Sequence, residues 1–83
     1  MIKPYIDSSV RTFSESVNQE DLVWHRDRED RTVKSINNTD WKIQLDGELP
    51  TSLNETVNIK REVWHRLIKG TGQLQLKIIK SNI

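Results

Sequence analysis

Apolar and polar side chains alternate in short runs along most of the chain from residue 22 onwards. Each run is rich in β-branched or aromatic residues, which is typical of strands that bury one face. The alternation predicts six short strands, at residues 22–27, 31–36, 41–45, 56–59, 63–68 and 74–79. Asparagine and glycine, which tolerate positive φ, separate several of these runs. We therefore expect an all-β protein, a small barrel of short antiparallel strands.

The first twenty residues are polar, rich in serine and less clearly patterned. Val10, Phe13 and Val17 are spaced by three and four, which suits a short helix, whereas residues 8–13 fit an edge strand equally well. We favour the strand. Residues 1–20 are then expected to form an N-terminal strand or arm and residues 21–83 the barrel, together making a single domain.

The tetrapeptide Val-Trp-His-Arg occurs at residues 23–26 and again at 63–66, and it contains both histidines of the chain. Strand alternation places His25 and Asp27 on one face and Trp24 on the other. In the second copy, His65 shares a face with apolar residues 63 and 67. If those apolar residues mark the interior, His25, Asp27 and His65 all point inward. The opposite arrangement, with tryptophans inside, stays open because tryptophan buries more area than valine.

Composition limits the functions open to this chain. Eighty-three residues, 34% hydrophobic and 30% charged, form one small domain with a thin core. Thirteen basic and twelve acidic side chains give a net charge of +1, so no strong field attracts nucleic acid or an anionic membrane. The absence of cysteine excludes disulfides and thiolate metal sites. No apolar run approaches the roughly 18 residues of a membrane span, and we expect a cytoplasmic protein.

The stretch from residue 25 to residue 79 resembles the cupin family of double-stranded β-helix barrels. Residues 54–59, a short loop and then the second Val-Trp-His-Arg with Gly70 look like the family's second motif, Gly-Asp-x-x-x-Ile-Pro followed by a loop, a histidine and a strand. In the first motif, Asp27 replaces the second histidine of His-x-His, and Arg31 or Thr32 stands where the family has glutamate. The resemblance implies a cupin-like barrel with a diverged metal site.

His25, Asp27 and His65 form a two-histidine, one-carboxylate set. Iron and 2-oxoglutarate dioxygenases, which are related to cupins, place such a set in the same kind of barrel, and it suits a ferrous ion with open coordination positions. We expect a divalent metal, namely Fe, Mn, Ni or Zn, at these three residues. Dioxygenase activity itself is the least favoured function, because so short a chain leaves little room for the helices and cosubstrate cleft that such enzymes use.

Three further polar residues are candidates for ligand binding. Arg31 lies near the lost glutamate position and would pair with Asp27 or hold an anionic ligand through both guanidinium nitrogens. Gln44 would join the histidines only if its strand face turns inward, and Arg66 belongs to a basic cluster around the second motif. A small-molecule or anionic-ligand site is thus the main rival to a metal.

A different class of function is also open. In this alternative hypothesis, the protein is a non-catalytic accessory protein whose barrel has lost the metal and which works through contacts with other proteins. In either case we expect a homodimer that protects its edge strands, with neither nucleic acid nor membrane as a partner.

Overall fold

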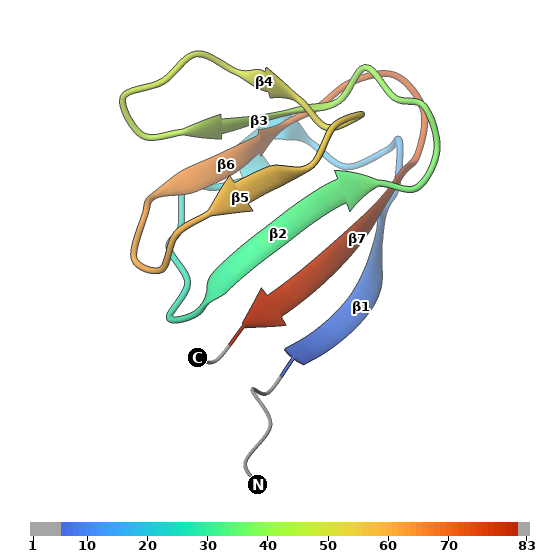
Figure 1. Cartoon of the computed structure of the whole chain (residues 1–83). Coiled ribbons are helices and arrows are strands. Elements are labelled where there is room, and N and C mark those ends of the chain that lie inside the picture. The colour runs from blue at the N-terminus through green and yellow to red at the C-terminus, as the bar shows by residue number, and fades with distance from the viewer. Residues whose placement is uncertain (1–5, 82–83) are drawn as a thin grey trace, which may run out of the picture.

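The computed structural model describes residues 6–81 and contains two antiparallel sheets that lie against each other (Figure 1). The first sheet has the order β1-β7-β2-β5, with strands Ile6–Phe13, Leu74–Ser81, Asp30–Ser35 and Val57–Ile59. The second has the order β4-β3-β6, with strands Thr51–Ser52, Lys42–Leu45 and His65–Ile68. The prediction of an all-β, barrel-like fold of short antiparallel strands is confirmed, although the two sheets do not close.

The N-terminal segment forms a strand, as we favoured over a helix. β1 pairs with β7 along its whole length, from Ile6 opposite Ser81 to Phe13 opposite Leu74. A 3-10 turn at Gln19–Asp21 follows before the first Val-Trp-His-Arg. Residues 1–5 of the expected arm and 82–83 of the expected barrel lie outside the described residues.

The predicted strand at residues 22–27 is wrong. This segment makes one isolated bridge, at His25, and then leaves the sheet. The reason is that its next backbone acceptor, the Asp27 carbonyl, receives the N–H of Glu62, which lies in a loop and has a left-handed φ of 65°. The ladder therefore cannot continue. The other five predicted strands are present with small shifts at their ends, and β4 was not predicted.

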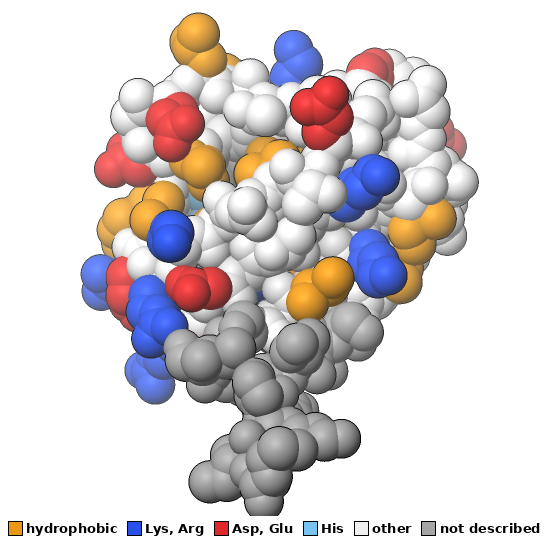
Figure 2. Space-filling model, viewed as in Figure 1, with side chains coloured by type: hydrophobic (Ala, Val, Ile, Leu, Met, Phe, Trp, Pro, Cys, Tyr) orange, Lys and Arg blue, Asp and Glu red, His pale blue; other side chains and the backbone are white. Residues whose placement is uncertain are grey.

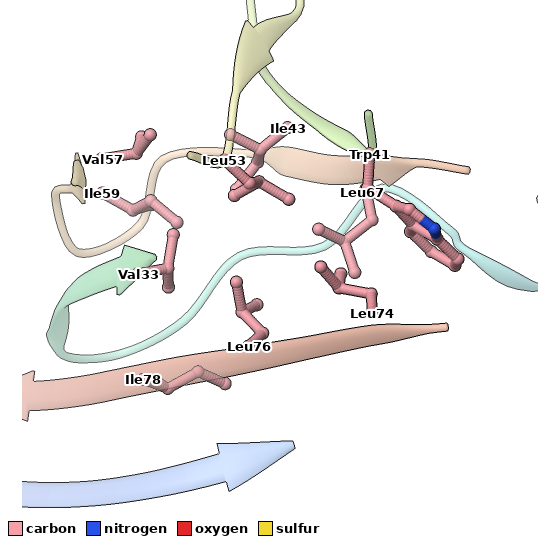
Figure 3. Packing of buried hydrophobic residues seen from close by; sticks show 10 residues of the cluster. All are labelled: Val33, Trp41, Ile43, Leu53, Val57, Ile59, Leu67, Leu74, Leu76 and Ile78. Carbon is pink, nitrogen blue, oxygen red and sulfur yellow. The ribbon is translucent and has the colours of Figure 1, made fainter. Parts of the chain in front are cut away.

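The core lies between the sheets, where inward-facing side chains of both meet (Figure 3). Trp41 is fully buried, and its Nε1 donates to the Gly72 carbonyl at 3.0 Å. Trp24 and Trp64 remain 38% and 44% exposed, whereas His65 and Leu67 are buried. The side chains of β6 therefore alternate so that His65 and Leu67 point into the core. The ten buried apolar residues are Val33, Trp41, Ile43, Leu53, Val57, Ile59, Leu67, Leu74, Leu76 and Ile78.

The surface carries both signs of charge. Figure 2 shows acidic and basic side chains interspersed on one face, between small apolar areas. Such mixing agrees with the net charge of +1. Among residues 6–81, no helix has the length and apolar character needed to cross a membrane.

Candidate metal site

The backbone brings the two histidines of the repeat together. His25 N–H donates to the His65 carbonyl at 3.0 Å, and His65 N–H donates to the His25 carbonyl at 2.9 Å. Directly opposed residues of an antiparallel pair project their side chains to the same side. The ring centroids accordingly lie 4.3 Å apart, with 59° between the ring planes. The two copies of the tetrapeptide therefore meet at their histidines.

Asp27 completes the group from the loop after the bridge. Glu62 N–H donates to the Asp27 carbonyl at 2.7 Å, which fixes the backbone there. The carboxylate then lies with Oδ2 3.2 Å from His65 Nε2 and Oδ1 3.4 Å from an Arg31 guanidinium nitrogen. Its side chain is only 12% exposed. The ligand atoms offered by His25, Asp27 and His65 all lie within 4.8 Å of one another.

Backbone carbonyls select the tautomer of both rings. His25 Nδ1 lies 3.0 Å from the Val23 carbonyl oxygen, and His65 Nδ1 lies 2.9 Å from the Val63 carbonyl oxygen. A carbonyl oxygen can only accept, so each Nδ1 carries the proton and donates it. In the neutral rings the Nε2 atoms keep their lone pairs, which is the state in which histidine binds metals.

The Asp27 carboxylate oxygen nearest His65 accepts no hydrogen bond from the part of the chain that the structure describes. Among the described residues, Asp27 Oδ2 is the buried side-chain atom for which none is found. It sits 3.2 Å from Nε2 of His65, so two acceptors face one another without a shared proton. Burying an unsatisfied acceptor costs roughly 1–3 kcal/mol. A cation between the two atoms would satisfy both.

The spacing of this pair fits a shared ion. Two atoms each about 2.1 Å from one metal, as in zinc sites, and 3.2 Å apart subtend an angle of about 100° at the metal. That angle lies between the octahedral and tetrahedral values. Two ligands about 2.1 Å from one ion lie at most about 4.2 Å apart, so a group whose atoms lie within 4.8 Å of one another would have to contract slightly when an ion binds.

Electrostatics keeps His65 in its neutral form. Burial lowers the pKa of His65 below its usual value, and nearby His25 lowers it further, although the hydrogen bond to Val63 and the Asp27 carboxylate act in the opposite direction. A lower pKa keeps Nε2 unprotonated and free to bind a metal at neutral pH.

Arg31 lies beside this group, as the sequence suggested, and it does pair with Asp27. Its stronger partner is Glu29, whose Oε1 accepts from Nε at 2.9 Å and from a terminal nitrogen at 2.7 Å. This side-chain hydrogen bond lowers the pKa of Glu29. Glu29 was not among the site residues that the sequence predicted. The alternating charges of residues 26–31 were the available signal, but which charges pair depends on the fold.

Gln44 and Arg66 lie on the other face of the three-stranded sheet. They are directly opposed in the β3–β6 register, while Leu45 opposes His65 on the inward face. Arg66 donates to Gln44 Oε1 from Nε at 3.2 Å and from a terminal nitrogen at 3.0 Å, and its guanidinium stacks over Trp24 at 4.8 Å. These two candidates are therefore not brought together with the histidines.

A cavity of about 170 Å³ opens beside the histidines, between the two sheets. His25, His65 and Arg31 form part of its wall. Apolar side chains from both sheets form most of the rest, including Phe13, Val33, Ile43, Leu67, Leu76 and Ile78. Arg11 and Asp21 also belong to the wall. The two histidines thus face a largely apolar space that is partly open to solvent.

Comparisons with known proteins support the fold and leave the family open. No protein-family model matches the chain, and no curated protein matches it. A solved structure that is similar is described as the crystal structure of protein NMB1881 from Neisseria meningitidis. It is 14% identical, with 96% of this chain and 84% of that chain covered and a TM-score of 0.58. At this identity the likeness establishes a shared fold.

Proposed function

We propose that this protein binds a divalent metal ion through His25, Asp27 and His65. The observation that supports it most concerns the buried Asp27 Oδ2, which has no hydrogen-bond partner among residues 6–81. This oxygen faces Nε2 of His65, and the ring's proton is on Nδ1, which donates to the Val63 carbonyl. No protein group among the described residues satisfies Asp27 Oδ2, and a cation between it and His65 Nε2 would do so. The cupin resemblance implies a metal in the same part of the fold.

The donor set favours particular metals. Two imidazole nitrogens and one carboxylate oxygen suit Zn, Fe, Mn or Ni, and the soft thiolate ligands that select Cu(I) or iron–sulfur clusters are absent from the chain. Three protein ligands leave at least one coordination position for a further ligand. The proposal is therefore binding with an open position, and an enzymatic reaction is not part of it.

Metal titration of the untagged protein tests the proposal. Zn²⁺ added to metal-free protein in a calorimeter is expected to bind at one site per chain, with His65→Ala and Asp27→Ala weakening the affinity at least about tenfold. Asp46→Ala removes an exposed carboxylate that does not belong to the histidine group and should leave the affinity unchanged. Equal zinc binding by all four proteins would contradict the site.

A second candidate is an accessory role through protein contacts. It is favoured by the half-exposed Trp24 and Trp64, each covered by a stacked arginine, because tryptophan and arginine are enriched at protein interfaces. Sedimentation of the wild type and of His25→Ala tests it together with the expected homodimer. This role predicts that removal of the histidine leaves fold and assembly state intact, and a change in either would count against it.

A further inference from the structure

The cavity beside the histidines has two chemically different ends. Figure 3 shows Ile43 and Leu67 of the three-stranded sheet facing Leu76 and Ile78 of the four-stranded sheet across the interior. All four residues line the cavity. The same space is also lined by His25, His65 and Arg31. A molecule inside it would meet apolar side chains on one part of its surface and the candidate metal ligands on another.

The cavity volume limits the size of an occupant. At about 170 Å³ it is close to the roughly 150 Å³ of apolar protein cavities that take up benzene. An apolar body of about six carbon atoms fits such a space. A nucleotide or a disaccharide is too large.

The charged side chains around the histidines determine which net charge a molecule bound in the cavity should have. Arg31 contributes one positive charge and is ion-paired with Asp27 and Glu29, which contribute two negative charges. Arg11 and Asp21, which also line the cavity, have opposite charges that cancel. With neutral imidazoles the formal charge is −1. A divalent cation changes it to +1 beside the buried His65, so a single negative charge on the occupant would restore neutrality.

We propose that the metal-loaded protein binds a monocarboxylate with a compact apolar body. The carboxylate takes the open coordination position beside Arg31, and the body lies between the sheets against Ile43, Leu76 and Ile78. This inference rests on the proposed metal site. Its ligand class follows from three features: the size of the cavity, its apolar walls and, once the metal is bound, a single uncompensated positive charge.

Calorimetry with small probes tests the inference in zinc-loaded protein. Benzoate has the expected charge and size, acetate has the charge without the body, and benzyl alcohol has the body without the charge. Since each buried methylene contributes about fourfold in affinity, benzoate should bind at least about tenfold more tightly than acetate. It should also bind at least about tenfold more tightly than benzyl alcohol, and metal-free protein should lose this preference.

The outcomes separate the two proposals. Zinc binding without a preference for benzoate overturns the inference and leaves the metal site standing. Absence of zinc binding in the preceding titration overturns both. Benzoate that binds equally well with and without zinc also overturns the inference, because the metal then contributes nothing.

A cavity-filling variant tests where the probe lies. Leu76→Phe occupies part of the cavity and should weaken benzoate binding at least about tenfold while zinc affinity is unchanged. Leu74→Phe is the matched control, since Leu74 is buried two residues away on β7 and is not part of the cavity wall. If Leu76→Phe does not fold, Val33→Leu adds a single methylene to the same cavity. Unchanged benzoate binding in the folded variant would contradict the assigned position.

Discussion

His25 and His65 are forty residues apart in the chain, yet they exchange both backbone hydrogen bonds, at 3.0 and 2.9 Å. This bridge sets the 4.3 Å separation of their rings. It also relates the two copies of Val-Trp-His-Arg by an approximate two-fold arrangement, because Arg26 stacks over Trp64 and Arg66 stacks over Trp24. The inward face of the repeat carries the candidate site, and the outward face carries two cation–π pairs.

Asp27→Asn should separate metal binding from folding. The new amide supplies a donor that His65 Nε2 lacks, and its oxygen still accepts from Arg31, so metal-free stability should stay within about 1 kcal/mol of wild type. Wild-type protein at a zinc concentration 100 times Kd should gain about 2.7 kcal/mol, whereas the variant should gain almost nothing. Urea unfolding with and without zinc measures both quantities. A variant that zinc stabilises as much as wild type would remove Asp27 from the ligand set.

The pH dependence of metal-free stability should report on His65. Because its pKa is lowered in the folded state, the unfolded chain binds a proton first as pH falls below about 6.5. Stability should therefore be unaffected by this group above that pH. Below it, stability should fall by at most about 1.4 kcal/mol per pH unit until the folded-state pKa is reached. Urea midpoints between pH 7.5 and 5 provide the measurement, with His65→Gln as the control that should flatten the slope.

Arg66→Ala should destabilise the protein more than Arg26→Ala, although both arginines stack on a tryptophan. Arg66 also donates twice to Gln44 and is partly buried, so its loss should cost about 1–3 kcal/mol. Arg26 is 54% exposed and pairs with an equally exposed Glu62, so its loss should cost about 0–1 kcal/mol. Chemical denaturation of the two variants measures the difference, and equal costs would contradict this ranking.

Gly70→Ala should cost more than Gly47→Ala. A Cβ at Gly70 would lie 2.6 Å from the Trp41 backbone nitrogen and would also meet the Asp40 carboxylate, so the backbone beside the core tryptophan must shift. That carboxylate accepts hydrogen bonds from Thr71 N–H and Oγ1, which the shift would disturb. At Gly47 nothing lies within 4 Å, so only the left-handed φ of 78° opposes alanine, at about 1–2 kcal/mol. Thermal melts of both variants compare them.

Alternation along the chain was sufficient to predict much of the fold. It predicted the all-β class and five of the strands, because side chains on an extended chain project to opposite sides in turn. Alternation could not predict the end of the segment at residues 22–27. The hydrogen bond from Glu62 to Asp27 that stops this strand joins two loops distant in sequence.

The sequence by itself determined that a tetrapeptide with a histidine occurs twice, and that the side chains of His65 and Arg66 point to opposite faces of their strand. Only the tertiary structure decided that the histidine face is the inner one, that His25 and His65 are direct neighbours, and that Arg31 is held chiefly by Glu29. The physical reason is the range of the interactions. Strand periodicity depends on adjacent residues, whereas the cavity and the unsatisfied Asp27 oxygen arise where loops and sheets far apart in the chain pack together.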